Sequence, residues 1–413
     1  MSKTVYIIGG GAAGFFCAIN MANLHPDYSI TILEKTTKLL SKVLVSGGGR
    51  CNTTHYCFDN SEMVKNYPRG FKELRGIFSR FSVKDTIEWF QERGVDLNAE
   101  ADGRMFPSTN SSQTIIDCFM EQAKEFGVKV KCKMEVLSIS EKADGLALEI
   151  KEDLPIAIGT KEIKKVNADV VVIATGGFPM KKGYSFLEKT THTIVEPIPS
   201  LYTFNVPKNP VTELMGVSVK EATIKIGGTP FVYSGPLLIT HWGFSGPAVL
   251  KLSAFAARHF NETNYNADIL INWVNIGQEQ TRTEFLKQTN GRKMLPKNSN
   301  IFNLPKRLWE FLLLKAEIDP NIAWEETAKR KINKIIELLS NDTYHMQGKT
   351  TFKEEFVTCG GIPLNEIDCK TMQSKKLPGL YFAGEVLNMD GITGGFNFQA
   401  AWSTAWVVAN SIV

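Results

Sequence analysis

The sequence predicts an α/β fold with a central parallel sheet, interrupted by an antiparallel, barrel-like insertion that carries a small helical subdomain. The first observation is a short apolar strand at 5–8 that runs directly into a turn of Gly and Ala. The second is that an apolar strand ending in glycine recurs at 168–175 and at 380–383, as is typical of buried parallel strands. The third is a change to alternating apolar and polar residues after 197–199, which favours antiparallel strands.

The order of the predicted elements sets the domain boundaries. Strand 5–8, helix 15–24 and strand 29–33 have together the length of one βαβ unit. Amphipathic helices at 83–93 and 112–126, a β-like stretch at 128–139 and a hairpin at 145–166 follow. We therefore expect the first part of a dinucleotide-binding domain at 1–195, a barrel-like domain at 196–275, a helical subdomain at 276–342, a return strand at 343–358 and the second part of the first domain at 359–413.

Composition indicates a folded cytoplasmic protein. The 413 residues are 43% hydrophobic and 22% charged, enough for two or three domains. The net charge of +4 comes from 47 basic and 43 acidic residues spread along the chain, which makes nucleic acid an unexpected main partner, although a mildly basic groove remains compatible with it. Seven cysteines without a CxxC pair disfavour a disulfide framework and a zinc site, so we expect no metal. We also expect neither a secretory signal nor a membrane span.

The first glycine turn, GGGAAG at 9–14, matches the GxGxxG fingerprint of dinucleotide-binding folds. Gly9 makes the tight turn, Gly11 admits a pyrophosphate, and Gly14 lets the helix pack on the strand. Glu34 lies 20 residues beyond Gly14, at the end of the next strand, where it suits a ribose hydroxyl and repels a 2′-phosphate. The alternative is a glycine turn of an unrelated α/β protein. The candidate cofactor residues here are Gly9, Gly11, Ala12, Ala13, Gly14, Glu34 and Lys35.

A second glycine cluster, SGGGRCN at 46–52, places three glycines before an Arg and an Asn. Such a loop lets the backbone approach a flat ring or a phosphate, although a flexible solvated loop is the alternative. Arg50 is a candidate for stabilising negative charge on a reduced flavin, and the Asn52 amide can donate and accept hydrogen bonds at a ring edge. The candidates are Gly48, Gly49, Arg50, Cys51 and Asn52.

A third glycine segment closes the chain. Gly384 and Glu385 follow the last apolar strand, and GITGGFN at 391–397 precedes a long apolar helix. The positive end of that helix would face the flavin pyrimidine, and Glu385 would accept from a ribityl hydroxyl. The alternative is that these glycines only cap the helix. Candidates at this helix are Gly395, Phe396 and Asn397.

These motifs resemble the bacterial YhiN-like and BaiN-like flavoproteins, within the glutathione-reductase type of FAD fold. The resemblance spans nearly the whole chain and rests on GGGAAG at 9–14, LVSGGGRCN at 44–52, DGRMFPSTNSSQT at 102–114, ATGG at 174–177, THWGFSGPAVL at 240–250, TCGGIPLNEI at 358–367 and GLYFAGEVLNMDGITGGFNFQAAWSTA at 379–405. It implies FAD as the cofactor and a Rossmann-like FAD-binding domain with an inserted β-barrel. It further implies that Val136 meets the adenine through its backbone and that Ala174, Thr175 and Gly176 lie near the dinucleotide.

The insertion supplies the candidate for proton transfer. His241 lies in THWGFSGP at 240–247. Histidine is the side chain that most readily exchanges protons near neutral pH, so His241 suits proton exchange with a substrate, unless it is simply a hydrogen-bonded loop histidine. Arg104 suits an anion pocket or a salt bridge within its turn.

A redox thiol at Cys51 or Cys359 is disfavoured, because no redox pair lies close together in the sequence. Since no second GxGxxG is present, NAD(P)H would bind transiently, or electrons would come from the substrate and leave to oxygen.

We therefore expect an FAD-dependent oxidoreductase that acts on a small molecule by hydride transfer at flavin N5. The family resemblance implies either NAD(P)H-driven reduction of a conjugated double bond, as in steroid-type enones, or oxidation of a small amine such as aminoacetone. Two alternatives remain open: an FAD-dependent RNA-modifying enzyme, for which the Lys runs at 329–331 and 375–376 are the only support, and a flavin-binding electron carrier or regulator.

Overall fold

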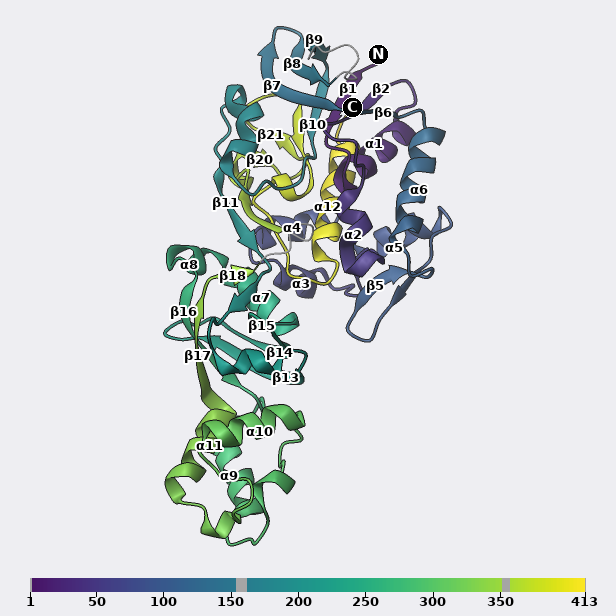
Figure 1. Cartoon of the computed structure of the whole chain (residues 1–413). Helices are drawn as coiled ribbons and strands as arrows, with labels where there is room; N and C mark the ends of the chain where they lie inside the picture. The colour runs from purple at the N-terminus through teal and green to yellow at the C-terminus, as the bar shows by residue number, and fades with distance from the viewer. Residues whose placement is uncertain (1, 154–161, 351–356, 413) are drawn as a thin grey trace. The chain divides into compact units, whose positions relative to one another are not determined.

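The computed structural model describes residues 2–153, 162–350 and 357–412. The chain divides into two units by its internal contacts (Figure 1). The first unit is formed by Met1–Pro199 and Lys353–Val413, and the second by Ser200–Phe352. No described helix has the length and apolar character that crossing a membrane requires.

The first unit is built on a seven-stranded sheet. Five strands are parallel, in the order β22 (Leu380–Phe382), β10 (Val170–Ile173), β1 (Thr4–Ile8), β2 (Ser29–Glu34) and β6 (Lys129–Cys132). The short strands β20 (Ile367–Asp368) and β21 (Gln373–Ser374) extend it in antiparallel pairing. All four residues of β10 are buried, which explains its nearly continuous apolar sequence.

Helices cover this sheet around an aromatic core. Helix α1 (Ala12–Leu24) packs against α12 (Phe396–Ala409) and α6 (Ser112–Glu125). The Phe16 ring lies 4.6 Å from Trp89 and 5.3 Å from Trp402, between ring centroids. These aromatic side chains bury large apolar areas, and their packing fixes the positions of the two helix N-termini. The remaining helices of this unit are α2 (Ser41–Gly49), α3 (Asn60–Met63), α4 (Phe71–Phe78) and α5 (Val83–Gln91).

Two small antiparallel sheets and one strand pair complete the first unit. One sheet contains β7 (Met134–Lys142), β8 (Gly145–Glu152) and β9 (Glu162–Ala168); the other contains β3 (Thr54–His55), β4 (Leu97–Ala99) and β5 (Arg104–Pro107); β11 (Val195–Ser200) pairs with β19 (Val357–Gly361). The predicted strand at 128–139 is in fact two strands, because Lys133 has a φ of 60° and redirects the chain from β6 to β7. Part of the predicted hairpin, 154–161, lies outside the described residues.

The second unit contains a seven-stranded antiparallel sheet. Its order is β17 (Asp342–Gln347), β16 (Asn266–Asn272), β13 (Ser218–Ile226), β14 (Val232–Thr240), β15 (Gly243–Ser245), β12 (Thr203–Asn205) and β18 (Lys349–Thr350). Helices α7 (Pro247–Phe255) and α8 (Ala257–Glu262) belong to the same unit. Among the described residues no pairing joins β17 to β18, so closure into a barrel stays a prediction.

The helical subdomain consists of α9 (Gln278–Thr289), α10 (Lys306–Lys315) and α11 (Lys329–Asn341) (Figure 1). Buried Phe285, Trp309 and Trp324 contribute to its core. The buried Asp342 carboxylate joins this subdomain to the sheet, since it accepts from Lys315 at 2.5 Å and from Trp273 Nε1 at 3.1 Å. The predicted return strand at 343–358 is not continuous: its first half forms β17 and β18, 351–356 lie outside the described residues, and its end belongs to β19.

Candidate functional site

Four candidate segments lie at the carboxyl edge of the parallel sheet. The glycine turn at 9–14 follows β1, Glu34 ends β2, Ala174–Gly176 follow β10, and Gly384–Glu385 follow β22. The chain leaves β1 for β2 on one side and reaches β10 on the other. Dinucleotides bind in the crevice at such a point of reversed strand order. The fold therefore brings together residues that are up to 376 positions apart in the sequence.

The first glycine turn is closed at two positions and open at the third. A Cβ on Gly9 would lie 2.4 Å from the Ala174 carbonyl oxygen, and one on Gly14 would lie 2.0 Å from the Gly9 carbonyl oxygen. At Gly11 a Cβ would meet no atom within 4 Å. Helix α1 begins here without a side-chain cap, so its N-terminal N–H groups are available to an anion. This geometry fits a pyrophosphate beside Gly11.

Glu34 is held firmly at this turn. Its carboxylate accepts from the Gly10 N–H at 3.0 Å and from the Thr36 N–H and hydroxyl, both at 2.8 Å. The next residue, Lys35, places its Nζ 5.2 Å from the centre of the Phe178 ring, which follows the 174–177 segment. A fixed carboxylate at the end of β2 fits the predicted ribose contact.

The triple-glycine segment begins as a helix and then kinks, rather than forming a loop throughout. Residues 41–45 are helical, after which Ser46 has a ψ of 146° and Gly47 and Gly48 have φ values of 58° and 70°. A Cβ on Gly48 or Gly49 would meet no atom within 4 Å. The backbone of this segment is thus open to a ligand.

Arg50 is positioned by the hairpin of β4 and β5. Its guanidinium lies 3.9 Å above the centre of the Phe106 ring, and its Nη1 is 2.7 Å from Glu100 Oε1. Arg104 pairs with the same Glu100 at 2.8 Å and with Asp102 at 2.7 Å, which agrees with the salt-bridge interpretation of that residue. Arg50 therefore has a defined place, and its contact with a flavin remains a prediction.

Cys51 is not a reactive thiolate in this structure. It is buried, and burial raises the pKa of its thiol to about 11, so the thiol is neutral at pH 7. All seven cysteines are free. The absence of a redox thiol pair remains a prediction.

Asn52 ties the triple-glycine segment to helix α12. With its amide oriented to satisfy both ends, it donates to the Thr54 carbonyl at 3.1 Å and accepts from the Gly395 N–H at 3.0 Å. Thr54 in turn donates through its hydroxyl to Gln399 at 2.6 Å, and Trp402 Nε1 donates to the Thr53 carbonyl at 2.9 Å. In the structure Asn52 therefore contacts the protein, and the predicted contact with a ring edge is not shown.

The N-terminus of α12 is fixed by side chains from distant segments. Asn397 accepts from the Gly391 N–H at 2.8 Å and donates to its carbonyl at 2.9 Å, which closes the turn. Tyr67 donates to the Phe396 carbonyl at 2.6 Å, and His55 Nδ1 lies 2.9 Å from the Gly394 carbonyl oxygen while its ring stacks on Phe396. The sequence analysis did not identify His55 or Tyr67. Their only sequence signal is their position shortly after the RCN motif.

Glu385 already has two protein partners. Its carboxylate accepts from the Thr358 N–H at 2.8 Å and pairs with Lys42 at 2.5 Å. A Cβ on Gly177 would lie 2.2 Å from the Thr358 hydroxyl, so the glycine permits this close approach. Thr358 and Lys42 were not predicted as site residues, and the ribityl contact of Glu385 remains a prediction.

The two remaining candidates lie in other elements. Val136 is buried in β7 at a bulge, where the register with β8 shifts between Val136 and Ser138. His241 is exposed in the turn between β14 and β15 of the second unit, and its ring packs edge-on against Trp242. The adenine contact of Val136 and the catalytic role of His241 remain predictions.

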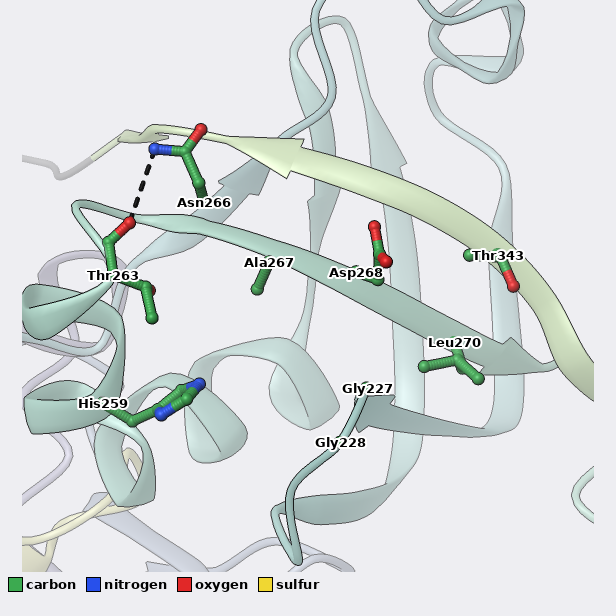
Figure 2. A pocket seen from close by; sticks show the side chains of 9 residues that line it. All are labelled: Gly227, Gly228, His259, Thr263, Asn266, Ala267, Asp268, Leu270 and Thr343. Carbon is green, nitrogen blue, oxygen red and sulfur yellow. Dashed lines mark hydrogen bonds between the residues drawn. The ribbon is translucent and has the colours of Figure 1, made fainter.

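Two hollows occur in the part of the chain that the structure describes. One of about 430 Å³ is lined by His259, Asp268 and Thr343 with their neighbours (Figure 2). The other, of about 440 Å³, is lined by Tyr6, Leu33 and residues of β6 to β9. Neither contains a residue that the sequence analysis selected. The described part of the chain also contains no group of side chains able to hold a metal ion.

Comparison with known proteins identifies the family. The model of the HI0933-like protein Rossmann domain matches residues 3–411. The chain belongs to this family. The predicted YhiN-like membership, the α/β fold with a Rossmann-type FAD-binding domain, and the assignment to FAD-dependent oxidoreductases are thereby confirmed.

Several relatives and solved structures are similar to this HI0933-like chain. "Ribosomal RNA dihydrouridine synthase" of Escherichia coli is 30% identical, over 98% of this chain and 97% of the relative. "3-dehydro-bile acid delta(4,6)-reductase" of Clostridium scindens is 25% identical, over 98% of each. The solved 3-ketosteroid Δ1-dehydrogenase of Sterolibacterium denitrificans has a TM-score of 0.53 and 11% identity, with 99% of each chain covered. This structural similarity supports the fold alone.

Proposed function

We propose that this protein is an FAD-dependent reductase that saturates a C=C bond conjugated with a carbonyl group, and that its substrate is a uracil ring in RNA. Relatives from Escherichia coli and Haemophilus influenzae, 30% and 29% identical over 98% of the chain, are named ribosomal RNA dihydrouridine synthases. This full-length similarity is the observation that carries the proposal. It raises the RNA-modifying alternative above the small-molecule function that the sequence analysis preferred.

The names of the two kinds of relative imply the same reaction, saturation of a C=C bond that is conjugated with a carbonyl group. Making dihydrouridine saturates the C5=C6 bond of uracil, which is conjugated with the C4 carbonyl. A 3-oxo steroid with double bonds at positions 4 and 6 carries the same arrangement. In both, the carbon at the far end of the conjugated system takes a hydride, and a neighbouring carbon or the carbonyl oxygen takes a proton. A single site chemistry therefore serves both substrate classes.

The site fits FAD by its shape and its dipoles. Gly11, Gly48 and Gly49 leave open space beside the backbone, and the N-termini of α1 and α12 both lack side-chain caps. Helix N-termini attract phosphate and the anionic side of a reduced flavin. Bound FAD, once reduced by NADH or NADPH, would supply the hydride from N5. The chain contributes the rigid cradle, and Arg50 contributes positive charge near the triple-glycine segment.

A small conjugated enone is the second candidate substrate. The Clostridium scindens relative, at 25% identity over the full length, supports it. None of the three relatives named above is an amine oxidase, so amine oxidation is not favoured.

We propose NADH or NADPH as a transient electron donor. We also propose a cytoplasmic location, with which the seven free cysteines agree.

Anaerobic spectroscopy tests this proposal. NADPH or NADH should bleach the absorbance of bound FAD, and uridine-containing RNA should then restore it. Restoration by an enone steroid but not by RNA would move the assignment to the second candidate. Bleaching of the oxidised protein by an amine, with peroxide on admission of air, would contradict a reductase.

His241 is the proposed proton donor to the substrate. Replacing it by Ala should leave FAD bound and slow reoxidation of the reduced protein by RNA about 10²-fold or more, because the proton would then come from water. The rate of flavin reoxidation under single-turnover conditions measures this step. His259→Ala, on α8 of the same unit, is the matched control. Equal rates for the wild type and His241→Ala would assign His241 a structural role.

A further inference from the structure

The charged residues are spread along the chain, but the two units differ in net charge. The second unit contains 18 basic and 13 acidic residues, a net charge of +5, whereas the first unit contains 29 basic and 30 acidic residues, a net charge of −1. The whole positive excess of the chain thus lies in the insertion. A polyanion would be attracted to this unit.

One stretch of the helical subdomain concentrates this charge. Residues 285–309, which we call the basic segment, contain six basic side chains and no Asp or Glu. The segment runs from the second half of α9, through a loop, to the first turn of α10. All six side chains are exposed: Lys287, Arg292, Lys293, Lys297, Lys306 and Arg307.

These positive charges are mostly not neutralised by the protein. Among the described residues, only Lys306 has a carboxylate within 4 Å, that of Glu310 at 3.9 Å. Lys297 donates to the Asn321 amide oxygen at 2.8 Å, and Arg307 donates to the Glu213 carbonyl at 2.6 Å. The nearby Glu325 donates its backbone N–H to the Arg292 carbonyl, and its carboxylate forms no ion pair with the segment. The surface therefore retains its positive charge.

The other side chains of the segment favour a nucleic acid over a lipid surface. Its apolar side chains, such as Leu286, Met294 and Phe302, pack against the core of the unit, and none of its large hydrophobic residues is exposed. A membrane-binding surface needs apolar side chains to insert. Exposed amides at Asn290, Asn298 and Asn303 lie between the cations. Cations with interspersed amide donors are the usual partners of phosphate and sugar oxygens.

We propose that the basic segment docks the phosphate backbone of the RNA substrate. This inference rests on the RNA branch of the proposed function. Docking there would supply sequence-independent affinity, so that recognition of the target uracil is left to the flavin site. It would also explain why a flavoenzyme of this size carries a helical subdomain with a net positive charge.

Binding of a fluorescein-labelled, uridine-containing RNA hairpin to the full-length protein tests the proposal. The test variant is Lys287→Glu/Lys293→Glu/Lys297→Glu, and the matched control is Lys84→Glu/Lys124→Glu/Lys142→Glu, three exposed lysines of the first unit. The test variant should bind about 10-fold or more weakly at about 100 mM salt, and the slope of log K against log salt should fall by about 2 to 3. The control should stay within about twofold of the wild type. Unchanged FAD absorbance verifies that both variants fold.

The remaining outcomes of this experiment would contradict the docking surface, the RNA substrate or both. Equal losses in both variants, or no loss in the test variant, would overturn the docking surface while leaving RNA as the substrate. Failure of the wild-type protein to bind RNA, with retained reduction of an enone steroid, would refute the RNA branch and the docking surface with it. Loss of binding to phosphatidylglycerol vesicles, with unchanged RNA binding, would reassign the segment to a lipid surface.

Discussion

The two glycine turns that begin α1 and α12 are held in different ways. The turn at 9–14 is fixed mainly through its backbone: Gly9 donates to the Leu33 carbonyl at 2.9 Å, Gly10 N–H donates to the Glu34 carboxylate at 3.0 Å, and the missing side chains of Gly9 and Gly14 permit close packing. The turn at 391–397 is fixed by side chains, including Asn397, Tyr67 and His55. The first turn is therefore encoded locally, whereas the second depends on residues more than 300 positions away.

This difference suggests what each turn tolerates. A turn made of backbone fails when a side chain is added, and its failure depends on where that side chain points. A turn held by side chains fails when one of its partners is removed, by an amount that reflects burial and charge. The following predictions test this contrast, from the largest expected effect to the smallest.

Valine substitutions within the first turn should separate folding from cofactor binding. Gly14→Val should prevent folding, because its Cβ would lie 2.0 Å from the Gly9 carbonyl oxygen. Gly11→Val should fold and lose FAD, because its side chain would enter open space where the pyrophosphate approaches. Circular dichroism and the flavin content of the purified protein measure the two effects. Normal flavin content in Gly11→Val would refute the assignment of this site.

In the segment before the second turn, the strongest constraint is the ion pair of Arg69 and Asp390. Asp390 is fully buried, and Arg69 Nε donates to its carboxylate at 2.6 Å. Arg69→Met should leave an uncompensated buried charge and lower the free energy of unfolding by about 3–5 kcal/mol. Urea denaturation of the flavin-free protein measures it. Lys65→Met, which removes an exposed pair with Glu62, is the control and should leave the urea midpoint nearly unchanged.

Removing the Asn397 side chain, which closes the second turn, should lower the stability of the protein by an intermediate amount. Asn397→Ala removes two hydrogen bonds to Gly391 and should destabilise the protein by about 1–3 kcal/mol. FAD should bind several-fold more weakly, since the N-terminus of α12 loses its fixed orientation. Titration of the flavin-free variant with FAD gives the affinity. A dissociation constant equal to that of the wild type would show that the turn is dispensable for the cofactor.

His192 lies outside both turns, and its substitution should have the smallest effect on stability. It is buried, its ring nitrogens lie 2.8 Å from the Thr190 hydroxyl and 2.9 Å from the Ser374 hydroxyl, and burial lowers its pKa below the ordinary value of about 6.5. The unfolded chain then binds a proton more readily than the folded chain, so its contribution to stability is present above about pH 6.5 and is lost as the pH falls. His192→Gln should flatten the dependence of Tm on pH below about 6.5. An unchanged pH dependence in that variant would contradict the lowered pKa.

The same contrast explains how much of the molecule the sequence predicts. The parallel sheet, the first glycine turn and Glu34 follow from local patterns, because strand, turn and helix are adjacent in the chain. The clamps made by Asn52, His55 and Tyr67 follow from no local pattern, since their partners are brought near only by the packing of α12. Likewise, the redirection at Lys133 has no clear sequence signal, because a positive φ at a lysine depends on tertiary context.

The uneven distribution of charge is visible in the sequence only once the boundaries of the two units are known. Averaging over the whole chain gives +4 and hides a stretch of 25 residues with six basic and no acidic side chains. Only the division into two units, and the exposure of all six side chains, shows that this charge is gathered on one part of the fold.

Nucleoside analysis of RNA after reaction tests the central claim most directly. RNA incubated anaerobically with NADPH and the FAD-loaded protein should yield uridine that has gained two hydrogen atoms, detected by mass spectrometry, and Gly11→Val should yield none. If the flavin is reduced by NADPH and the RNA nucleosides remain unchanged while an enone steroid is saturated, uracil in RNA is not the substrate. If neither substrate gains hydrogen, the assignment as a reductase of conjugated double bonds is wrong.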